Sequence, residues 1–360
     1  MMASQILDHV SPALQPLFSL APSQYCQAYF GILGLGCVTL QIFPSLQDAL
    51  LGYGARKADK DANPEDDTGT NLFVKLLGKL GMLTRVPHSW FAHFYIALLC
   101  FQVFWLAQLV TNGGVMRAIA ESEVAHGGGK GMEFGQIVLA WGMVTMQGAR
   151  RLYECLVVMK PSTSPMLALH WVLSFLVYVA LSISVWVEGS ETILHTSLEN
   201  ADVAPPFWTL FPLVSFSMAS KQQQEAHKHL ASLKKYTLPT AGLFRYLTCP
   251  HYTCECIIYV TLATVAAPRG STFNPTLIAA LFFVVSNLGA TARSTKKWYI
   301  EKFGREKVPR WSMIPFFFQT DTRLTLVTSG FEKILAPKEI PVCDRPSREV
   351  DVLSGVGNAV

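Results

Sequence analysis

Long apolar segments recur along the chain and are separated by short polar stretches. A helix needs roughly 20 mostly apolar residues to cross the hydrocarbon core of a bilayer, and somewhat fewer where flanking side chains snorkel or the bilayer thins. Seven segments come close to this length, at about 26–51, 90–110, 132–149, 166–187, 203–219, 254–267 and 274–292. The pattern predicts an all-α, polytopic membrane protein with about seven transmembrane helices.

Two of these segments, 203–219 and 254–267, are short for a full span, and the first contains three prolines. Backbone interrupted by proline cannot face lipid, because its unpaired polar groups find no partner there. We therefore expect both helices to be shielded by their neighbours or to line a cavity.

Basic residues are concentrated in alternate loops between the apolar segments. No Lys or Arg precedes residue 26, and if this end is luminal, the cytosolic loops hold twenty-six of the 29 Lys and Arg residues. Cytoplasmic loops carry such an excess. The pattern predicts a luminal N-terminus, a cytosolic C-terminus and an odd number of spans, and it argues against a cleaved signal peptide.

Composition agrees with a membrane protein. The 360 residues are 51% hydrophobic and 15% charged, whereas soluble domains have about 25% charged residues. The net charge of +4 comes from basic residues that are segregated in particular loops. We therefore expect membrane lipid as a partner and no nucleic acid. The eight cysteines are scattered, several within apolar runs, which indicates reduced thiols and no disulfide framework.

Three motifs resemble ligand sites but lack the required spacing. FGILGLGC at 30–37 lies in an apolar run with the wrong glycine spacing, and HGGGKG at 126–131 lacks the Ser or Thr that follows Lys in a phosphate loop. CPHYTCEC at 249–256 lacks the paired spacing of zinc ligands. We therefore expect close helix packing at the first motif, a luminal loop at the second and no metal site at the third.

Polar residues collect at the predicted cytosolic ends of the later segments. Arg150, Arg151 and Glu154 follow the third segment. Such an arginine pair is often only an interfacial anchor, but arginine also binds phosphate through paired hydrogen bonds. Glu154 lies one helical turn after Arg151 and can hold its guanidinium group in place.

Further polar residues lie on the same predicted side of the membrane. They share a helical face or follow the last span: Gln223, His227 and Lys234; His251, Tyr252 and Glu255; and Asn287, Lys296 and Tyr299. The first group also fits a solvated amphipathic helix. Together these groups predict a site where a soluble, phosphate-bearing cofactor meets a lipid-embedded substrate.

The order of these motifs resembles the steroid 5α-reductase superfamily. The sequences that carry the resemblance are RRLYE, QQEAHKHLASLKK, LFRYLTCPHYTCE, KKWYIEKF and PRWSMIPFFF, and VPHSWFAHFY at 86–95 is similar to the polyprenol (polyprenal) reductase branch. The similarity divides the chain into a first helix and polar linker at 1–85, a membrane-embedded reductase domain at 86–318 and a cytosolic tail at 319–360. The steroid-reductase-like part of the domain covers about 168–318.

This resemblance implies a seven-helix fold in the endoplasmic reticulum membrane, NADPH bound on the cytosolic side and a long-chain polyprenyl lipid as substrate. The positions that match the cofactor-side pattern are Arg151, His227, Lys234, His251, Tyr252, Glu255 and Tyr299. Gln223, Asn287 and Lys296 join them because they belong to the same clusters. His251 departs from the family pattern, which has an asparagine there.

A second departure concerns the proton donor. Gly148 stands where the steroid enzymes have a proton-donating tyrosine, so the resemblance makes a steroid substrate doubtful and requires another acid. The candidates are His93 and Tyr95 at the start of the second span, and Glu154.

The implied reaction is the reduction of the α-isoprene double bond of polyprenal in dolichol synthesis for protein N-glycosylation. Hydride from NADPH adds to the β-carbon, an acid polarises the carbonyl oxygen, and the enolate is protonated at the α-carbon. An allylic alcohol offers no such electron sink. Two alternatives stay open: an ene-reductase of the same superfamily that acts on enoyl-CoA or a sterol, and a non-enzymatic transporter or scaffold that binds no nicotinamide.

The charge pattern makes a prediction about topology. In a chain otherwise free of cysteine, Thr196→Cys is expected to react with an impermeant maleimide only from the lumen, and Ala231→Cys only from the cytosol, because their loops differ in basic residues. The reverse labelling would contradict both the orientation and the predicted side of the cofactor site.

Overall fold

The computed structural model describes residues 19–42, 85–129, 131–160, 165–234 and 236–315. Most of them are helical, which confirms the predicted all-α class. The end of the first predicted span, most of the predicted linker and the predicted tail lie outside the described residues. The three predicted domains therefore remain predictions.

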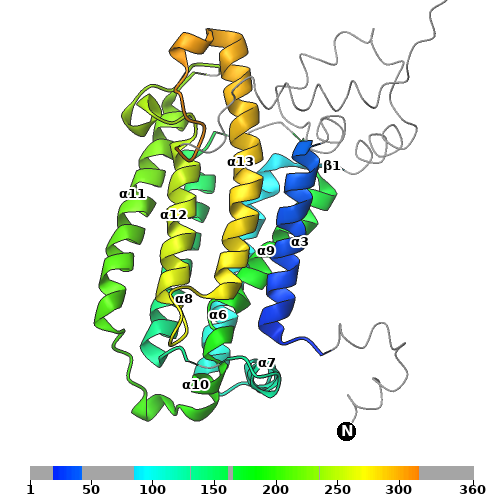
Figure 1. Ribbon diagram of the computed structural model, residues 1–360, viewed down its shortest axis with the longest axis vertical. Coiled ribbons are helices and arrows are strands. Elements are labelled where there is room, and N and C mark those ends of the chain that lie inside the picture. Colours follow the sequence, from blue (N-terminus) through cyan, green and yellow to red (C-terminus); the bar gives the residue numbers. More distant parts are fainter. Residues whose placement is uncertain (1–18, 43–84, 130, 161–164, 235, 316–360) are drawn as a thin grey trace, which may run out of the picture. The chain divides into compact units, whose positions relative to one another are not determined.

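Seven helices of 16 residues or more run side by side in the described part of the chain (Figure 1). They are α3 (Pro22–Ile42), α6 (Ala92–Val110), α8 (Phe134–Tyr153), α9 (Ala168–Ser184), α11 (Leu210–Ser232), α12 (Pro250–Val265) and α13 (Pro275–Phe303). Each overlaps one predicted segment. Helices α11 and α13 continue past the predicted ends of their segments, so the polar residues that follow these segments lie on the same continuous helices.

Four stretches in the described residues are long and apolar enough to cross a membrane: Pro22–Ile42, Ser89–Val110, Ala168–His195 and Pro275–Phe303. They support a multi-pass membrane protein. The number of seven spans and the orientation remain predictions.

The prolines of the fifth predicted segment do not break its helix. Pro205 and Pro206 lie before α11, and Pro212 lies in its first turn, where the helix needs no N–H donor from it. The side chains of Phe207 and Phe211 at this end are 88% and 80% exposed. The expected shielding therefore does not extend to this face of α11, whose intact backbone can face lipid.

One end of the bundle is built from short elements, at the bottom of Figure 1. They are α7 (Gly114–Ala125), η3 (Val187–Gly189), α10 (Ser190–His195), η4 (Leu198–Asn200) and η5 (Phe207–Thr209). The buried carboxylate of Glu123 on α7 accepts hydrogen bonds from the backbone N–H and the hydroxyl of Ser23, at 2.8 and 2.7 Å. These bonds fix the first turn of α3, which would otherwise leave N–H groups unpaired.

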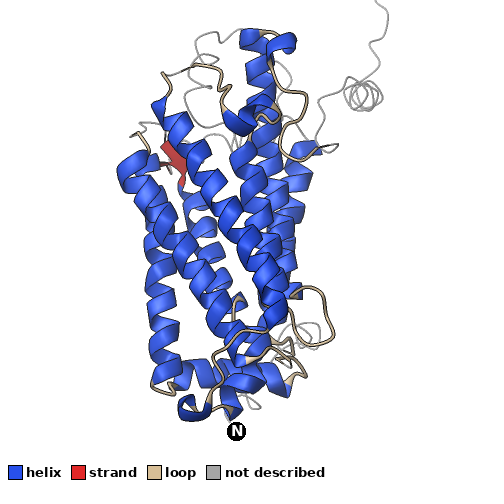
Figure 2. Cartoon of the chain, turned by 90° about the vertical axis from the view of Figure 1, so that its left-hand side faces the viewer, coloured by secondary structure: helices blue, strands red, loops and turns tan. Residues whose placement is uncertain are grey.

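The opposite end carries an antiparallel pair of short strands, β1 (Arg85–Pro87) and β2 (Pro165–Leu167), drawn in red in Figure 2. Arg85 pairs with Leu167. The remaining short elements are η1 (His88–Phe91), η2 (Glu154–Val158), η6 (Gly242–Arg245) and η7 (Arg305–Lys307). Backbone bonds from Thr248 to Trp311 and from Cys249 to Ser312 tie the start of α12 to the segment after α13.

The core lies between the long helices, with α3 packed along α13 and α11 along α12. Its largest fully buried side chains include Phe30, Trp186, Phe216 and Leu277. At Gly34 a Cβ would overlap the ring of Phe282, so this glycine lets α3 approach α13 closely. The expected helix packing at FGILGLGC is therefore seen at Gly34. The seven cysteines of the described part are free thiols.

Candidate active site

A buried polar cluster forms where α8 ends. The last turn of α8 carries Arg150 and Arg151, and the helix continues directly into η2, which is a π-helical turn. Glu154 begins that turn and is fully buried, and the two arginine side chains are only 13% and 11% exposed. π turns are rare and recur at functional sites.

Glu154 is the centre of this cluster. Both guanidinium groups donate hydrogen bonds to its carboxylate, and Nδ1 of His227 lies 2.7 Å from it. Burial by itself would raise the pKa of Glu154, but the hydrogen bond with His227 and the charges of Arg151 and Arg150 outweigh burial and hold the pKa at about 2. The carboxylate is therefore ionised, and it accepts hydrogen bonds without having a proton to donate.

A second carboxylate, Glu255, joins the cluster through two glutamines. Gln223 donates to Glu255, and Nε2 of Gln147 lies 3.0 Å from the side-chain oxygen of Gln223. The Arg150 guanidinium donates to both glutamines. These bonds join α8, α11 and α12. The sequence prediction missed Gln147, although its place one turn before Arg150 and Arg151 is the signal that could have found it.

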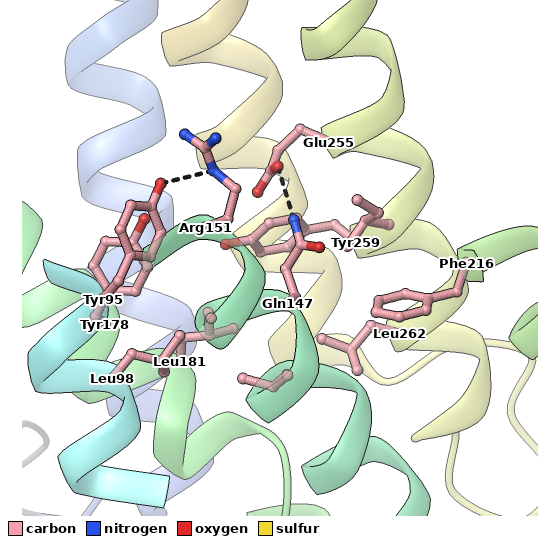
Figure 3. Close-up of a pocket in the computed structure, with 13 residues that line it drawn as sticks. Tyr95, Leu98, Gln147, Arg151, Tyr178, Leu181, Phe216, Glu255, Tyr259 and Leu262 are labelled. Carbon is pink, nitrogen blue, oxygen red and sulfur yellow. Dashed lines mark hydrogen bonds between the residues drawn. The ribbon is translucent and has the colours of Figure 1, made fainter. Parts of the chain in front are cut away.

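A pocket opens directly beside this cluster, between α6, α8, α9, α11 and α12 (Figure 3). Its polar lining consists of Tyr95, Gln147, Arg151, Tyr178, Glu255 and Tyr259, and its apolar lining of Leu98, Val144, Gly148, Leu181, Phe216, Ile258 and Leu262. Ligand sites are usually of this kind, mostly apolar with a few convergent polar groups.

Arg151 connects the polar cluster with the pocket. Its Nε donates a hydrogen bond of 3.1 Å to the hydroxyl of Tyr95, drawn as a dashed line in Figure 3. Its other side faces Glu154 and His227. Tyr95 is 6% exposed, and its hydroxyl is also hydrogen-bonded with that of Tyr178. One guanidinium group therefore orients the Tyr95 hydroxyl and is itself held by Glu154.

Gly148 lies in the wall of the pocket, where α8 approaches α6. A Cβ at this position would lie 3.0 Å from a methyl group of Leu98, closer than ordinary van der Waals contact. Because Gly148 has no side chain, the space beside Tyr95 and Tyr178 stays open. A larger side chain at this position would therefore fill part of the pocket.

His251 and Tyr252 lie at the start of α12, next to the cluster. The ring of His251 is 5.4 Å from that of His227 and 4.2 Å from that of Tyr252. Burial, followed by the charges of His227 and Arg151, lowers the pKa of His251 well below its usual value. His251 is therefore neutral at physiological pH.

His93 does not line the pocket. Its ring lies 5.3 Å from the ring of Trp90 and 6.2 Å from that of Trp171. Tyr95, two residues further along α6, does line it. Of the two candidate acids in VPHSWFAHFY, the structure brings only Tyr95 to the pocket.

The remaining predicted residues lie outside the pocket and the cluster. Lys234 and Asn287 are exposed. Lys296 is buried and donates to the backbone carbonyl of Arg310. The ring of Tyr299 lies 5.4 Å from that of Trp298. Their predicted contacts with a cofactor remain predictions.

Three nitrogen atoms of the cluster have no hydrogen-bond partner among the described residues. They are Nε of Arg150 and Nδ1 of His251, which are both buried, and Nη2 of Arg151. A buried polar atom without a partner costs about 1–3 kcal/mol. The cluster therefore has free polar atoms that an anionic ligand could satisfy.

Comparison with known proteins gives one family and a consistent set of relatives. Residues 163–318 match the family model described as 3-oxo-5-alpha-steroid 4-dehydrogenase. The chain is 36% identical over 168 residues to the polyprenal reductase of Saccharomyces cerevisiae, a match that covers 46% of this chain and 59% of that protein. It thus spans less than two thirds of the yeast protein. Tyr95 and Arg151 precede the residues matched by the family model.

Two further relatives are matched over more of their length. The polyprenal reductase of Drosophila melanogaster is 29% identical over 263 residues, which cover 64% of this chain and 76% of that protein. The polyprenal reductase of Xenopus laevis is 24% identical over 323 residues, which cover 80% of this chain and 97% of that protein.

The depressed pKa of Glu154 makes a prediction about stability. Glu154→Gln is expected to lower the melting temperature at pH 7, because two buried arginines lose their charged partner. A lowered pKa adds stability that is complete above the ordinary value of 4.5 and is lost as the pH falls toward about 2. The difference in melting temperature between wild type and Glu154→Gln should therefore shrink over this range.

The matched control is Glu225→Gln, which changes an exposed glutamate of α11 and should leave the melting temperature nearly unchanged. A wild-type advantage that stays constant from neutral to acidic pH would contradict the assignment of an ionised, paired Glu154.

Proposed function

We propose that this chain, whose residues 163–318 match the family model described as 3-oxo-5-alpha-steroid 4-dehydrogenase, is an NADPH-dependent reductase that saturates the α-isoprene double bond of polyprenal. The main support for the proposal is the position of Arg151. It donates one hydrogen bond to Tyr95 in the mostly apolar pocket and another to Glu154 in the buried ionic cluster. The names of the relatives point to the same substrate.

The polar cluster fits the phosphate-bearing part of NADPH. The free nitrogens of Arg150 and Arg151 suit phosphate oxygens, which arginine binds through parallel hydrogen bonds. Glu154 holds both guanidinium groups in place. Gln223, His227, His251, Tyr252 and Glu255 would line the rest of the site. NADPH supplies the hydride when bound.

The apolar side of the pocket fits the isoprene unit. Leu98, Leu181, Phe216 and Leu262 come from four helices and offer no charge. The exposed apolar faces of the bundle allow a long prenyl tail to remain in the lipid. The substrate aldehyde then lies at the polar side of the pocket, next to Tyr95.

Tyr95 is the acid that polarises the carbonyl oxygen. Arg151 donates to its oxygen, which makes the phenol a stronger hydrogen-bond donor toward the substrate. When hydride adds to the β-carbon, negative charge develops on the carbonyl oxygen, and a donor placed there stabilises the transition state. Glu154 is ionised and acts as a positioning residue for Arg151 in place of its predicted role as an acid.

The alternatives are less well supported. An enoyl-CoA or sterol ene-reductase would use the same chemistry, but the relatives are polyprenal reductases. A transporter or scaffold would have no need for a buried arginine that donates a hydrogen bond to a tyrosine in the pocket. We therefore propose that the protein acts in dolichol synthesis for N-glycosylation, as a multi-pass protein of the endoplasmic reticulum membrane.

The substrate is tested by supplying purified protein in lipid nanodiscs with NADPH. Oxidation of NADPH is expected with polyprenal and not with an enoyl-CoA or a sterol enone, because only polyprenal joins a conjugated aldehyde to a tail that stays in the lipid. Turnover of enoyl-CoA alone would assign the protein to the alternative, and binding of no nicotinamide at all would exclude a reductase.

The acid is tested by comparing two neighbouring residues of α6. Tyr95→Phe is expected to lower kcat by a factor on the order of 10²–10⁴ while NADPH still binds, because only the donor to the carbonyl is lost. His93→Ala should keep near-normal turnover if its melting temperature is unchanged. The opposite pattern would transfer the role of acid to His93.

A further inference from the structure

Besides Tyr95 and Tyr178, a third tyrosine, Tyr259, lines the pocket. Tyr259 lies on α12, one turn after Glu255, and is 7% exposed. Its hydroxyl group lines the pocket and forms no hydrogen bond with any residue that the structure describes. Figure 3 shows it extending from α12 toward the side of the pocket that holds Arg151 and Tyr95.

The hydroxyl oxygen of Tyr259 is not among the enclosed polar atoms that lack a partner in the described part of the chain, so it is accessible from the pocket. A polar group that faces a pocket and has no protein partner is available to hydrogen-bond a bound ligand. The other tyrosines of the pocket differ in this respect. Tyr95 accepts a hydrogen bond from Arg151, and the hydroxyls of Tyr95 and Tyr178 are hydrogen-bonded to each other.

Tyr95 and Tyr259 reach the pocket from different helices, α6 and α12. Figure 3 shows both hydroxyls on the side of the pocket that holds Arg151. A carbonyl oxygen has two lone pairs and can accept two hydrogen bonds at once. An aldehyde that accepts a bond from Tyr95 therefore has one acceptor position left, and a free hydroxyl lies in the same pocket.

We propose that Tyr259 is a second catalytic residue, which donates a hydrogen bond to the same carbonyl oxygen as Tyr95. The inference rests on the proposed function. Hydride adds to the β-carbon, the π electrons of the double bond form the new bond between the α-carbon and the carbonyl carbon, and the carbonyl π pair moves to oxygen. The two phenol O–H bonds stay intact and share the resulting negative charge.

A second donor changes how the reaction is stabilised. A hydrogen bond to the oxygen is stronger when that oxygen is an enolate than when it is a neutral carbonyl, so each donor lowers the barrier more than it tightens binding. Loss of one preorganised donor of this kind lowers kcat about 10²–10³-fold. Tyr259 lies one turn after Glu255, at the edge of the polar cluster that is proposed to hold the cofactor.

The direct test is the carbonyl stretching frequency of bound polyprenal labelled with ¹³C at the aldehyde carbon, measured with the oxidised cofactor so that no reaction occurs. Each hydrogen bond to the oxygen lowers this frequency. The frequency in the wild-type complex is expected to lie below the value in hydrocarbon, and Tyr259→Phe and Tyr95→Phe are each expected to remove part of the shift. Tyr259→Phe should also lower kcat with little change in KM for polyprenal.

The matched control is Tyr246→Phe, which removes the hydroxyl of a tyrosine that is 67% exposed and should change neither the frequency nor kcat. If Tyr259→Phe does not fold, 3-fluorotyrosine at position 259 replaces it. Its phenol is a stronger donor, so it should lower the frequency further. A frequency that responds to neither change at 259 would overturn the role of Tyr259.

The same experiment separates this inference from the proposed function. If wild-type protein binds no polyprenal and oxidises no NADPH with it, the proposed function fails. If wild type reacts and shows the shift, while Tyr259→Phe retains the full shift, only the role of Tyr259 fails. A variant that loses turnover with the shift intact would reduce Tyr259 to a structural residue and would likewise contradict the inference.

Discussion

The structure depends on one buried ionic cluster at the end of α8. Two arginine side chains lie almost out of solvent there, and Glu154 accepts hydrogen bonds from both. Buried charges are stable only when they are paired and hydrogen-bonded, and removing one partner leaves an uncompensated charge. Glu154 therefore determines where both guanidinium groups lie, and through Gln147 and Gln223 the ends of α8, α11 and α12 are joined. The direction of the Tyr95 hydroxyl follows from this arrangement.

Much of the fold could be predicted from the sequence, because a spanning helix must be long and apolar. The seven predicted segments all correspond to helices, and several predicted polar residues, such as Arg151, His227 and Glu255, meet at one end. Helical periodicity placed them on shared faces, and the alternation of basic loops placed them on one side. The ends of α11 and α13 were predicted too early, because a polar sequence can continue a helix once it has left the apolar segment.

The pocket itself was harder to predict, because its side chains come from segments that read as uniformly apolar. Tyr178 and Tyr259 lie inside such runs, where an aromatic residue gives no sign of facing a cavity. For the same reason, the sequence does not show whether His93 or Tyr95 faces the pocket. Successive residues of a helix are rotated by about 100°, so residues two apart point in nearly opposite directions. Which of them faces inward depends on the packing of α6 against α8 and α9, and the sequence of α6 does not contain that information.

Gly148 shows how one position can connect packing with chemistry. Because it has no side chain, α6 and α8 approach closely and the pocket stays open beside Tyr95. A tyrosine at this position would fill that space and bring its own hydroxyl to it. With glycine at this position the space stays open, and in the proposed reaction the hydrogen-bond donors have to come from other helices. Tyr95 on α6, Tyr178 on α9 and Tyr259 on α12 all border this space, so the hydroxyl groups that face it come from helices other than α8.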